Sequence, residues 1–375
     1  MGPDSGAITL VGLTYPFRGG ISHYTTMLFK ALERDHRVSL ISFTRLYPAF
    51  LFPGVTQFDH SRVAFGVQNE RIIDTLNPVS WLKAFLKIKR QGCRLVVFQW
   101  WSPFFGLCFG TIGHLLRLFT RQKVVFICHN LIPHERHWAD RFFSRYALSS
   151  ADRLIAHSER DAESAKRLLP HVEAVCNPHP AYGQFHINRP SRSEAQGKLS
   201  VEGKVLLFFG YVRPYKGLQY LLKALPRVLE ETDVTLLVAG EFYDQKQTYL
   251  DLIRSLGLGA QVKVIDRYIP NEEVEVYFTA CDVVILPYVS GTQSGIVQIA
   301  YSFDKPVICT SVGGLPDVVV EGQTGFVVNP EDPHALARAI LAFYGSKGTD
   351  DFTDHIAAYK GRFGWDKLIE AITNV

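Results

Sequence analysis

The sequence predicts two α/β domains, each built around a parallel β-sheet. Short runs rich in β-branched residues alternate with amphipathic segments along the chain, which is the pattern of repeated strand–helix units. The 375 residues, 47% of them hydrophobic and 20% charged, are enough to bury a large core that divides in two. No strand is predicted between residues 179 and 203, where the chain is polar and contains turn formers. A second series of predicted strands and helices begins after this range.

The first series predicts a domain over residues 1–185. Its strands are expected at 8–13, 37–43, 94–100, 123–128 and 153–158. Its helices are expected at 21–33, 104–119 and 159–169. The run 95–116 is nearly uncharged and long enough to suggest a membrane span, but Gln99 and Pro103 interrupt it. We therefore interpret it as a strand followed by a helix.

The second series predicts a domain over residues 204–350, after a linker at 186–203 that contains NRPSRSEAQGKLSVEG. Its strands are expected at 204–210, 234–240, 262–268, 282–288, 306–310 and 324–328. The remaining residues, 351–375, end in FGWDKLIEAITNV, which reads as a helix with Trp365 and Leu368 on one face.

Charge and cysteine content narrow the class of partner and the compartment. The 40 Lys and Arg against 36 Asp and Glu give a net charge of +4, too mild for a nucleic-acid groove but compatible with an anionic small ligand. The six cysteines stand singly, without metal-binding or CxxC spacing, at positions 93, 108, 128, 176, 281 and 309. We interpret them as buried reduced thiols, which favours a cytoplasmic location.

Loops that follow predicted strands carry residues suited to binding phosphate. Open parallel sheets bind ligands beyond the carboxyl ends of their strands, where helix N-termini present unpaired N–H groups. In TYPFRGGIS, Gly19 and Gly20 allow a close backbone approach, although a plain turn is the alternative. The loop GYVRPYKGL begins at Gly210 and carries Arg213 and Lys216, which form either an anion clamp or a solvated surface pair.

The stretch VSGTQSGIVQIAY places small and hydroxylated residues directly before an apolar helical run. Backbone amides of Ser294, Gly295 and Ile296 are expected at the helix start, with the side chains of Thr292 and Gln293 as neutral donors beside them. An ordinary Ser N-cap is the alternative. The later loop SVGGLPD supplies another Gly pair.

The first domain offers a different set of candidates. CHN places His129 and Asn130 at the end of a predicted strand, where a purely structural His is the alternative. QWWSPFFGLCF follows another strand, and Trp100 and Trp101 are candidates to stack on sugar rings or meet lipid, while core packing is expected for at least half of its aromatic residues. Basic residues follow nearby: Arg117, Arg121 and Lys123. Contact with an anionic membrane is therefore a further expectation.

Several catalytic motifs are missing from the sequence. It has no Asp-x-Asp pair after a strand, no HExxH and no Cys/His cluster, so we expect neither a catalytic metal nor a cofactor. A GxSxG nucleophile elbow is also missing. The remaining pattern suits a nucleoside-diphosphate donor, whose leaving group must be stabilised as it gains charge.

Together these motifs resemble those of glycosyltransferase family 4 over essentially the whole chain. PFRGGIS resembles the first Gly-rich loop of the family, GYVRPYKGL its Arg/Lys donor loop, and CDVVILPY with KPVICTSVGGLPDVVVEGQTGFVV its long C-terminal signature. The resemblance implies the GT-B fold, in which two Rossmann-like doubly wound parallel-sheet domains face each other across a cleft. It also implies that the terminal helix crosses back to the first domain.

The resemblance also implies roles for the site residues. The first Gly-rich loop would approach the donor phosphate, Arg213 and Lys216 would neutralise the diphosphate, and His129 would face the transferred sugar or the acceptor. The amides that begin at Ser294 would hold phosphate and sugar oxygens.

This chain departs from the family pattern at three positions. The family commonly carries two Glu separated by seven residues, and those positions here are Gly291 and Ile299. Gln293 and Gln298 are candidates to make these contacts instead. Tyr211 stands where the donor-loop Arg is more usual. Our preferred interpretation of these departures is a variant donor site. The second interpretation is a catalytically silent GT-B scaffold that binds a nucleotide sugar or a partner enzyme, and the third is a nucleotide-sugar epimerase.

The expected function is metal-independent, retaining transfer of a sugar from a nucleoside-diphosphate sugar to a hydroxyl acceptor, of the hexosyltransferase type, in polysaccharide or glycolipid assembly. The expected partners are a nucleotide sugar and a saccharide or lipid-linked saccharide, with peripheral membrane contact and no nucleic acid. The expected location is the cytoplasm, at the inner face of the membrane.

Overall fold

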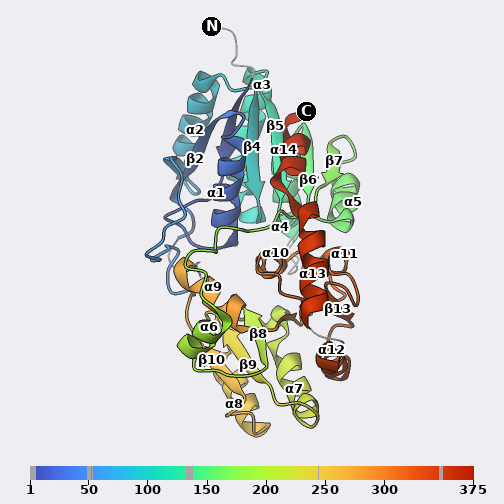
Figure 1. The fold of residues 1–375 in the computed structure, drawn as a ribbon. Coiled ribbons are helices and arrows are strands. Elements are labelled where there is room, and N and C mark those ends of the chain that lie inside the picture. The colour runs from blue at the N-terminus through green and yellow to red at the C-terminus, as the bar shows by residue number, and fades with distance from the viewer. Residues whose placement is uncertain (1–5, 49–51, 53, 132–137, 244, 346–348) are drawn as a thin grey trace. The chain divides into compact units, whose positions relative to one another are not determined.

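The chain forms two compact units. The computed structural model describes residues 6–48, 52, 54–131, 138–243, 245–345 and 349–375 (Figure 1). The first unit comprises Met1–His60, Ala64–Pro178 and Gly364–Val375, and the second comprises Ser61–Val63 and His179–Phe363.

The first unit is built on a parallel sheet of seven strands in the order β3-β2-β1-β4-β5-β6-β7. The strands are β1 (Ala7–Val11), β2 (Arg37–Arg45), β3 (Glu70–Asp74), β4 (Leu95–Trp100), β5 (Lys123–Cys128), β6 (Arg153–Ala156) and β7 (Glu173–Cys176). All five strands predicted for this half are present. The two edge strands, β3 and β7, were not predicted, because ERIID and EAVC are short and each begins with an exposed charged residue.

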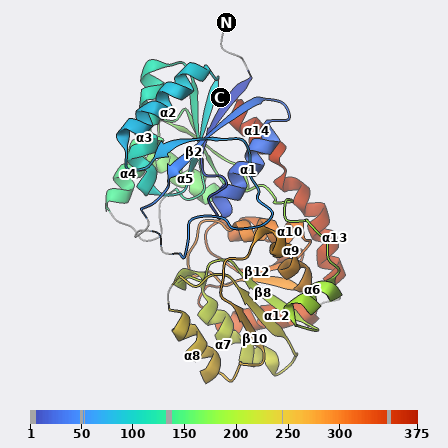
Figure 2. The same ribbon diagram turned by 90° about the vertical axis from the view of Figure 1, so that its left-hand side faces the viewer.

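Helices cover both faces of this sheet: α1 (Gly20–Leu32), α2 (Pro78–Gln91), α3 (Gly106–Phe119), α4 (Trp138–Leu148), α5 (Glu159–Leu168) and α14 (Trp365–Thr373). α2, α3 and α4 lie in a row on one face, while α1 and α14 pack together on the other (Figure 2). Helix α2 was not predicted, although Asn77 caps it and Pro78 begins it.

Glycines explain why α3 packs inside the protein. A Cβ built on Gly106 would stand 2.6 Å from Cβ of Phe143, one on Gly110 would stand 2.5 Å from the ring of Tyr146, and one on Gly113 would stand 2.2 Å from Oγ of Ser150. This stripe of missing side chains lets α4 approach closely. Among the described residues, no helix is both long and apolar enough to span a bilayer.

The second unit is built on a parallel sheet of six strands in the order β10-β9-β8-β11-β12-β13. The strands are β8 (Val205–Phe209), β9 (Thr235–Ala239), β10 (Val262–Ile265), β11 (Val283–Leu286), β12 (Val307–Thr310) and β13 (Gly325–Val328). The helices are α6 (Arg192–Leu199), α7 (Leu218–Leu229), α8 (Lys246–Ser255), α9 (Asn271–Ala280), α10 (Gly295–Ser302), α11 (Leu315–Val318), α12 (Pro333–Gly345) and α13 (Thr349–Tyr359). All six predicted strands are present, and the fold is that of two Rossmann-like units, as predicted.

The segment 186–203, which we predicted to be a linker, is largely structured. It contains α6, whose first turn is closed by a capping box between Ser191 and Glu194. Upstream of α6, the buried Glu275 carboxylate accepts hydrogen bonds from the backbone amides of residues 187–189 at 2.8 to 3.0 Å. The polar, turn-rich composition of the segment 186–203 therefore reflects caps and backbone contacts rather than a loose connection.

The C-terminal stretch contains two helices rather than one. A 3-10 turn, Lys360–Phe363, separates α13 from α14, and the chain enters the first unit at Gly364. There Arg153 donates to the backbone oxygen of Ala371 at 2.9 Å, and the ring of Trp365 lies 5.2 Å from that of Tyr24.

The strand order fixes where ligands are expected in each unit. Connections from the central strands run in opposite directions at β1 and β4 in the first sheet, and at β8 and β11 in the second. Ligands of doubly wound sheets bind outside the carboxyl ends of strands at such switch points. The Gly19 loop follows β1, and the loops of Lys216 and Ser294 follow β8 and β11, so the predicted motifs lie at these two positions.

Candidate functional site

In the second unit, the loop after β8 turns sharply to bury Lys216. Gly210 has a φ of +95°, and a Cβ there would stand 3.1 Å from Nζ of Lys216 and 3.7 Å from Cδ1 of Ile296. Gly217 has a φ of +70°, and a Cβ there would stand 1.8 Å from the backbone oxygen of Pro287. Both positions require glycine, and together they press the end of this loop against the end of β11.

The Lys216 ammonium is a buried charge. The residue is only 9% exposed, and Nζ lies 5.4 Å from the ring centroid of Tyr288. Burial lowers the pKa of Lys216, Tyr215 raises it and Arg213 lowers it further. No carboxylate among the described residues forms an ion pair with it. Because an unpaired buried cation is costly, its geometry favours a bound anion.

The start of α10 lies beside Lys216, and Tyr288 connects the two. Ser294 is the N-cap, and its Oγ accepts from the amide of Ile296 at 3.3 Å. The same Oγ lies 3.0 Å from the hydroxyl of Tyr288, whose ring faces Lys216. The structure thus brings the predicted cation and the predicted helix start together. Tyr288 was not predicted as a site residue; its position as the last residue of DVVILPY, at the end of a strand, was the available signal.

The SVGG loop after β12 supports the TQSG loop. The amide of Gly314 donates to the backbone oxygen of Thr292 at 2.7 Å. Gly313 has a φ of +56°, and a Cβ there would stand 2.2 Å from the backbone oxygen of Gly291. This Gly pair therefore holds the loop that precedes α10 in place.

Two glutamines near α10 have buried amide atoms without a hydrogen-bond partner among the described residues. They are Oε1 of Gln298, which is 1% exposed as a residue, and Nε2 of Gln293. Buried amide groups are nearly always satisfied in a complete complex. Ile299, at one of the positions where the family commonly has Glu, is buried, and Gly291, at the other, is half-buried.

Gly295 has two neighbours that the sequence did not indicate. A Cβ there would stand 3.3 Å from Cε2 of Tyr182 and 4.0 Å from Nε2 of His179. His179 donates through Nδ1 to the backbone oxygen of Pro180 at 3.0 Å, which leaves Nε2 to accept from the Tyr182 hydroxyl at 3.3 Å. A Cβ at Gly295 would therefore require the Tyr182 ring to shift by a few tenths of an ångström.

Arg213 lies in a different environment from Lys216. Its guanidinium carbon stands 4.2 Å from the ring centroid of Tyr243, which is a cation–π contact. The half-buried Tyr211 ring lies 4.8 Å from Tyr243 and 6.5 Å from Tyr268. The structure therefore places Arg213 with an aromatic group that follows β8, β9 and β10. Among the described residues, no hydrogen bond joins Arg213 to the Ser294 turn.

In the first unit, the Gly-rich loop opens α1. Gly19 has a φ of +108° and is the N-cap, and α1 begins at Gly20. A Cβ added at either glycine meets no atom within 4 Å. The backbone at this helix start is therefore accessible, unlike the packed glycines of the second unit.

His129 lies at the end of β5 within a network of polar and aromatic side chains. Its Nε2 is 2.7 Å from Oε1 of Gln99, an acceptor, so Nε2 carries the proton. The ring of Tyr24 stands edge-on to His129 at 4.4 Å, and the ring of His157 lies 5.3 Å away. A Cβ on Gly12 would stand 2.7 Å from Cγ of Gln99, so this glycine leaves room for the glutamine. Gln99 was not predicted.

The predicted acceptor residues differ in accessibility. Trp100 is fully buried, and its indole N–H points to the backbone oxygen of Leu131 at 3.4 Å. Its ring has no exposed face on which a sugar could stack, because β4 places it in the core. Trp101 and Asn130 are half-buried, and the Trp101 indole donates to the hydroxyl of Tyr47 at 3.3 Å.

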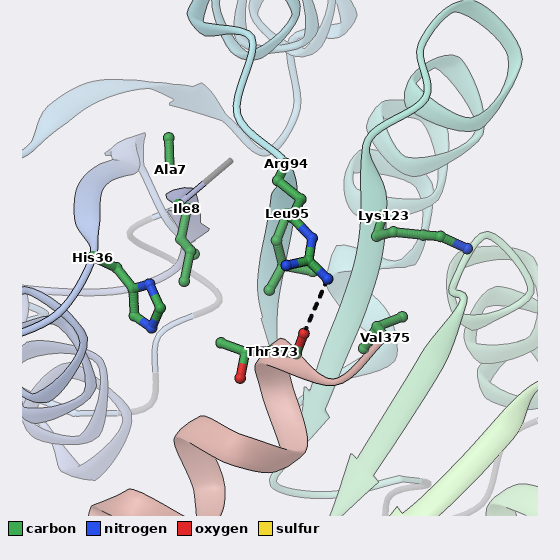
Figure 3. Close-up of a pocket in the computed structure, with 9 residues that line it drawn as sticks. Ala7, Ile8, His36, Arg94, Leu95, Lys123, Thr373 and Val375 are labelled. Carbon is green, nitrogen blue, oxygen red and sulfur yellow. Dashed lines mark hydrogen bonds between the residues drawn. The ribbon is translucent and has the colours of Figure 1, made fainter. Parts of the chain in front are cut away.

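A recess in the first unit lies at the amino ends of β1, β4 and β5, the opposite edge of the sheet from Gly19 and His129. In Figure 3 its walls include Ala7, Ile8 and Leu95, and Arg94 reaches toward the backbone oxygen of Thr373 at 3.4 Å. Lys123 points away from its centre and pairs with Asp152 at 3.0 Å. With apolar walls and engaged cations, this recess lacks the features of a phosphate site.

No group of three or more His, Cys, Asp or Glu side chains among the described residues is arranged to hold a metal ion. The groups brought together at the candidate site of the second unit are the Lys216 ammonium, the Tyr288 ring and hydroxyl, and the start of α10 at Ser294.

Two family models match this chain. The model described as Glycosyltransferase Family 4 matches residues 18–178, and that described as Glycosyl transferases group 1 matches residues 203–346. The D-inositol 3-phosphate glycosyltransferase of Corynebacterium glutamicum (strain R) is 26% identical over 280 residues, which cover 67% of this chain and 66% of that protein. The corresponding protein of Streptomyces scabiei is 30% identical over 246 residues, covering 60% and 54%. The chain thus spans between about half and two thirds of the length of these relatives.

Solved structures share the architecture. HepE of Anabaena, in complex with UDP, superposes with a TM-score of 0.74 at 17% identity, covering 99% of this chain and 100% of that one. Sucrose-phosphate synthase from Thermosynechococcus elongatus gives 0.71 at 20% identity, covering 98% and 96%. Two Rossmann-like units with these sheets are the GT-B fold, and the two matched models place the chain among the glycosyltransferases of this fold. Within that class, the chain belongs to glycosyltransferase family 4.

Proposed function

We propose that this protein is a retaining glycosyltransferase that moves a sugar from a nucleoside-diphosphate sugar to a hydroxyl acceptor without a metal ion. The observation that carries the proposal is Lys216, a buried ammonium with no described carboxylate partner, beside the N-terminus of α10. A diphosphate is the ligand that such a site would complete, because both a cation and a helix start attract phosphate oxygens.

The chemistry follows from where charge develops. As the bond between the anomeric carbon and the diphosphate oxygen breaks, negative charge grows on the leaving group, and Lys216 with the amides from Ser294 onward would stabilise it. The acceptor oxygen forms its new bond on the same face of the sugar, so configuration is retained. Its proton passes to the leaving phosphate, and no carboxylate base is needed.

The remaining residues take supporting roles in this proposal. The buried amides of Gln293 and Gln298 would bind the donor in place of the Glu pair, since each has an atom without a partner among the described residues. Arg213 would approach the diphosphate from its place over Tyr243. His129, with Nε2 held by Gln99, would present its ring to the sugar or the acceptor.

We assign donor binding to residues 204–350 and acceptor binding to residues 1–185. A nucleotide sugar is supported by the family and by the UDP bound to HepE, which has the same fold. We further propose a saccharide or lipid-linked saccharide acceptor, a role in polysaccharide or glycolipid assembly, and a cytoplasmic location. Trp101 and Asn130 are the half-buried candidates on the acceptor side.

The test is Lys216→Ala, assayed against a panel of UDP-, GDP- and ADP-sugars with saccharide and lipid-linked acceptors. We expect kcat to fall by two to three orders of magnitude, since loss of one charge-stabilising donor costs about 3 to 4 kcal/mol of transition-state stabilisation. Lys223→Ala, at an exposed lysine of α7, is the matched control and should keep full activity. Near-normal turnover of Lys216→Ala would overturn the proposal.

A second candidate function is a silent scaffold that binds a nucleotide sugar without transferring it. It is favoured by one observation, namely that Gly291 and Ile299 stand where the family commonly has its two Glu. Donor binding in calorimetry, together with no transfer or hydrolysis across the whole panel, would select this alternative.

A further inference from the structure

One segment of the chain has a charge very different from the rest. Residues 75–134 contain eight Lys and Arg and no Asp or Glu. Because the whole chain has 40 basic and 36 acidic residues, the remainder has 32 basic against 36 acidic and is net negative. This acid-free segment includes α2 and α3, which pack side by side on one face of the first sheet (Figure 2).

The outward face of α2 is apolar where a surface helix is normally polar. Val79, Leu82 and Leu86 are 60%, 47% and 39% exposed, and their spacing of three and four residues places them on one stripe. A second face of the helix is also apolar and packs into the core through Trp81, Phe85 and Ile88. The helix is therefore hydrophobic on both faces, and packing within the first unit explains only one of them.

The end of α3 extends this stripe. Leu118 and Phe119 are 74% and 53% exposed. The ring of Phe119 lies 6.1 Å from that of Phe85 on α2, and Nζ of Lys89 stands 5.8 Å from the first ring and 6.0 Å from the second. Lys89 lies three residues after Leu86 on the helix surface and contacts both rings, so the end of α3 borders the α2 stripe at this position. We call the stripe and this end of α3 the α2–α3 surface; it consists of Val79, Leu82, Leu86, Leu118 and Phe119.

Basic side chains surround this surface. The exposed ones are Lys83, Lys89, Arg90, Arg117 and Arg121. None of them forms an ion pair with a described carboxylate, whereas Lys87 and Lys123 pair with Glu70 and Asp152. An apolar stripe with unpaired cations at its edges matches a layer that is apolar inside and anionic at its surface. A second copy of this chain would instead set like charges against each other.

We propose that the α2–α3 surface docks this protein on an anionic lipid bilayer. The aliphatic and aromatic side chains enter the boundary between headgroups and acyl chains, and the five cations contact lipid phosphates. The expectation from sequence placed membrane contact on the aromatic segment after β4, but Trp100 and Phe105 of that segment are fully buried. The inference does not depend on the proposed sugar transfer, because docking is measurable without a donor or an acceptor.

The experiment is co-sedimentation of the full chain with vesicles of equal parts phosphatidylglycerol and phosphatidylcholine. We expect binding at low salt, weaker binding at high salt, and little binding to pure phosphatidylcholine. Leu82→Glu combined with Leu86→Glu should weaken binding at least tenfold. Lys83→Gln and Arg90→Gln should each weaken it about fivefold at low salt and reduce its salt dependence. All substituted positions are exposed, so the fold should persist, as circular dichroism would check.

The matched control is Val55→Glu, at a residue that is 90% exposed in the loop before β3 and lies outside the acid-free segment. It should bind vesicles like the unmodified protein. Failure of the folded protein to pellet with anionic vesicles at low salt would overturn the proposal, as would unchanged binding by the Leu82→Glu, Leu86→Glu variant. So would sedimentation velocity showing a dimer that the same double substitution dissociates, because the occupant would then be a second copy of this chain.

Discussion

The carboxyl edges of the two sheets have the same topology but different chemistry. In the second unit, the loops after β8, β11 and β12 are packed against one another through glycines, and they enclose a single buried cation. In the first unit, the Gly19 loop is open, and the residues behind it form a network of Gln99, His129, His157 and Tyr24. The first edge also carries a buried cation, Arg18, directly before Gly19. The two edges therefore differ in how tightly their loops pack and in the neutral rings and amides behind the Gly19 loop.

Under the proposed function, the two edges would divide the work of a transfer reaction. Charge stabilisation would need preorganised donors that do not move, and the glycine-packed loops of the second unit would supply them. An edge that accepts varied hydroxyl groups needs accessible backbone and directional neutral groups. Substitutions at the carboxyl edge of the second sheet test whether its loops are rigid. The pH dependence of stability tests whether the first unit depends on neutral histidines.

The largest effect on the free energy of unfolding is expected from a substitution at Gly217. Gly217→Ala would place a Cβ 1.8 Å from the backbone oxygen of Pro287, at a φ of +70°. The combined strain and overlap should lower the free energy of unfolding by about 3 to 5 kcal/mol, as measured by urea denaturation.

The matched change is Gly20→Ala in the first unit, where an added Cβ meets no atom within 4 Å. It should alter the free energy of unfolding by less than about 0.5 kcal/mol. Equal effects of the two substitutions would remove the contrast between a packed loop and an open one.

The next largest expected effect is a pH dependence of the free energy of unfolding, which arises from the first unit. Burial lowers the pKa of His157 to about 4, although its hydrogen bond to the backbone oxygen of Asn177 raises it. Since the folded pKa lies below the unfolded value of 6.5, the unfolded chain binds more protons between these values. Stability is therefore full above pH 6.5 and falls, by about 3 kcal/mol for this group, as the pH drops to about 4.

Urea denaturation between pH 4 and 7 checks this, with His157→Gln expected to flatten the pH dependence. His171→Gln, at an exposed position, should leave it unchanged. His23 is also buried with a pKa lowered to about 4, so part of the slope should persist in His157→Gln. The prediction would be contradicted if the free energy of unfolding varied with pH in the same way in the unmodified protein and in His157→Gln.

The same contrast explains how much the sequence could predict. Lys216 and Ser294 were predictable because each follows a β-branched run and precedes a helix, and parallel strands bring their carboxyl ends to one edge. Local pattern and topology are sufficient for such residues.

Other features depend on side-chain packing that no local pattern encodes. Trp100 and Trp101 are adjacent in QWWSPFF, yet one is core and the other half-buried, because Trp100 is the last residue of β4 and Trp101 lies beyond it at the margin of the same core cluster. Gln99 looked like an interruption of an apolar run, but it contacts His129 across the end of the sheet. Tyr288 looked like the end of a strand, and only the structure shows its contacts with Lys216 and Ser294.

A smaller effect is expected at Gln99. Gln99→Leu would leave the buried Nε2–H of His129 without its acceptor, which costs about 1 to 3 kcal/mol of stability. Long-range nitrogen–proton NMR of histidine-labelled protein should show His129 as the Nε2–H tautomer before the change and a mixture of tautomers after it. His129→Gln identifies the signal. If His129 carries its proton on Nδ1 in the unmodified protein, Gln99 does not position it.

The smallest effect, on kcat/KM, is expected from a substitution at Tyr288. This substitution tests most directly whether the loops at the carboxyl edge of the second sheet are rigid. Tyr288→Phe removes the hydroxyl that lies 3.0 Å from Oγ of Ser294 but keeps the ring that faces Lys216. The lost hydrogen bond is worth about 1 kcal/mol, so kcat/KM for the donor should fall about fivefold, with little change in stability. Tyr220→Phe, at a residue of α7 whose hydroxyl donates to Glu331, is the matched control and should keep its activity. If both variants behave alike, the position of Ser294 does not depend on Tyr288, and the backbone contacts of Gly313 and Gly314 alone hold this loop.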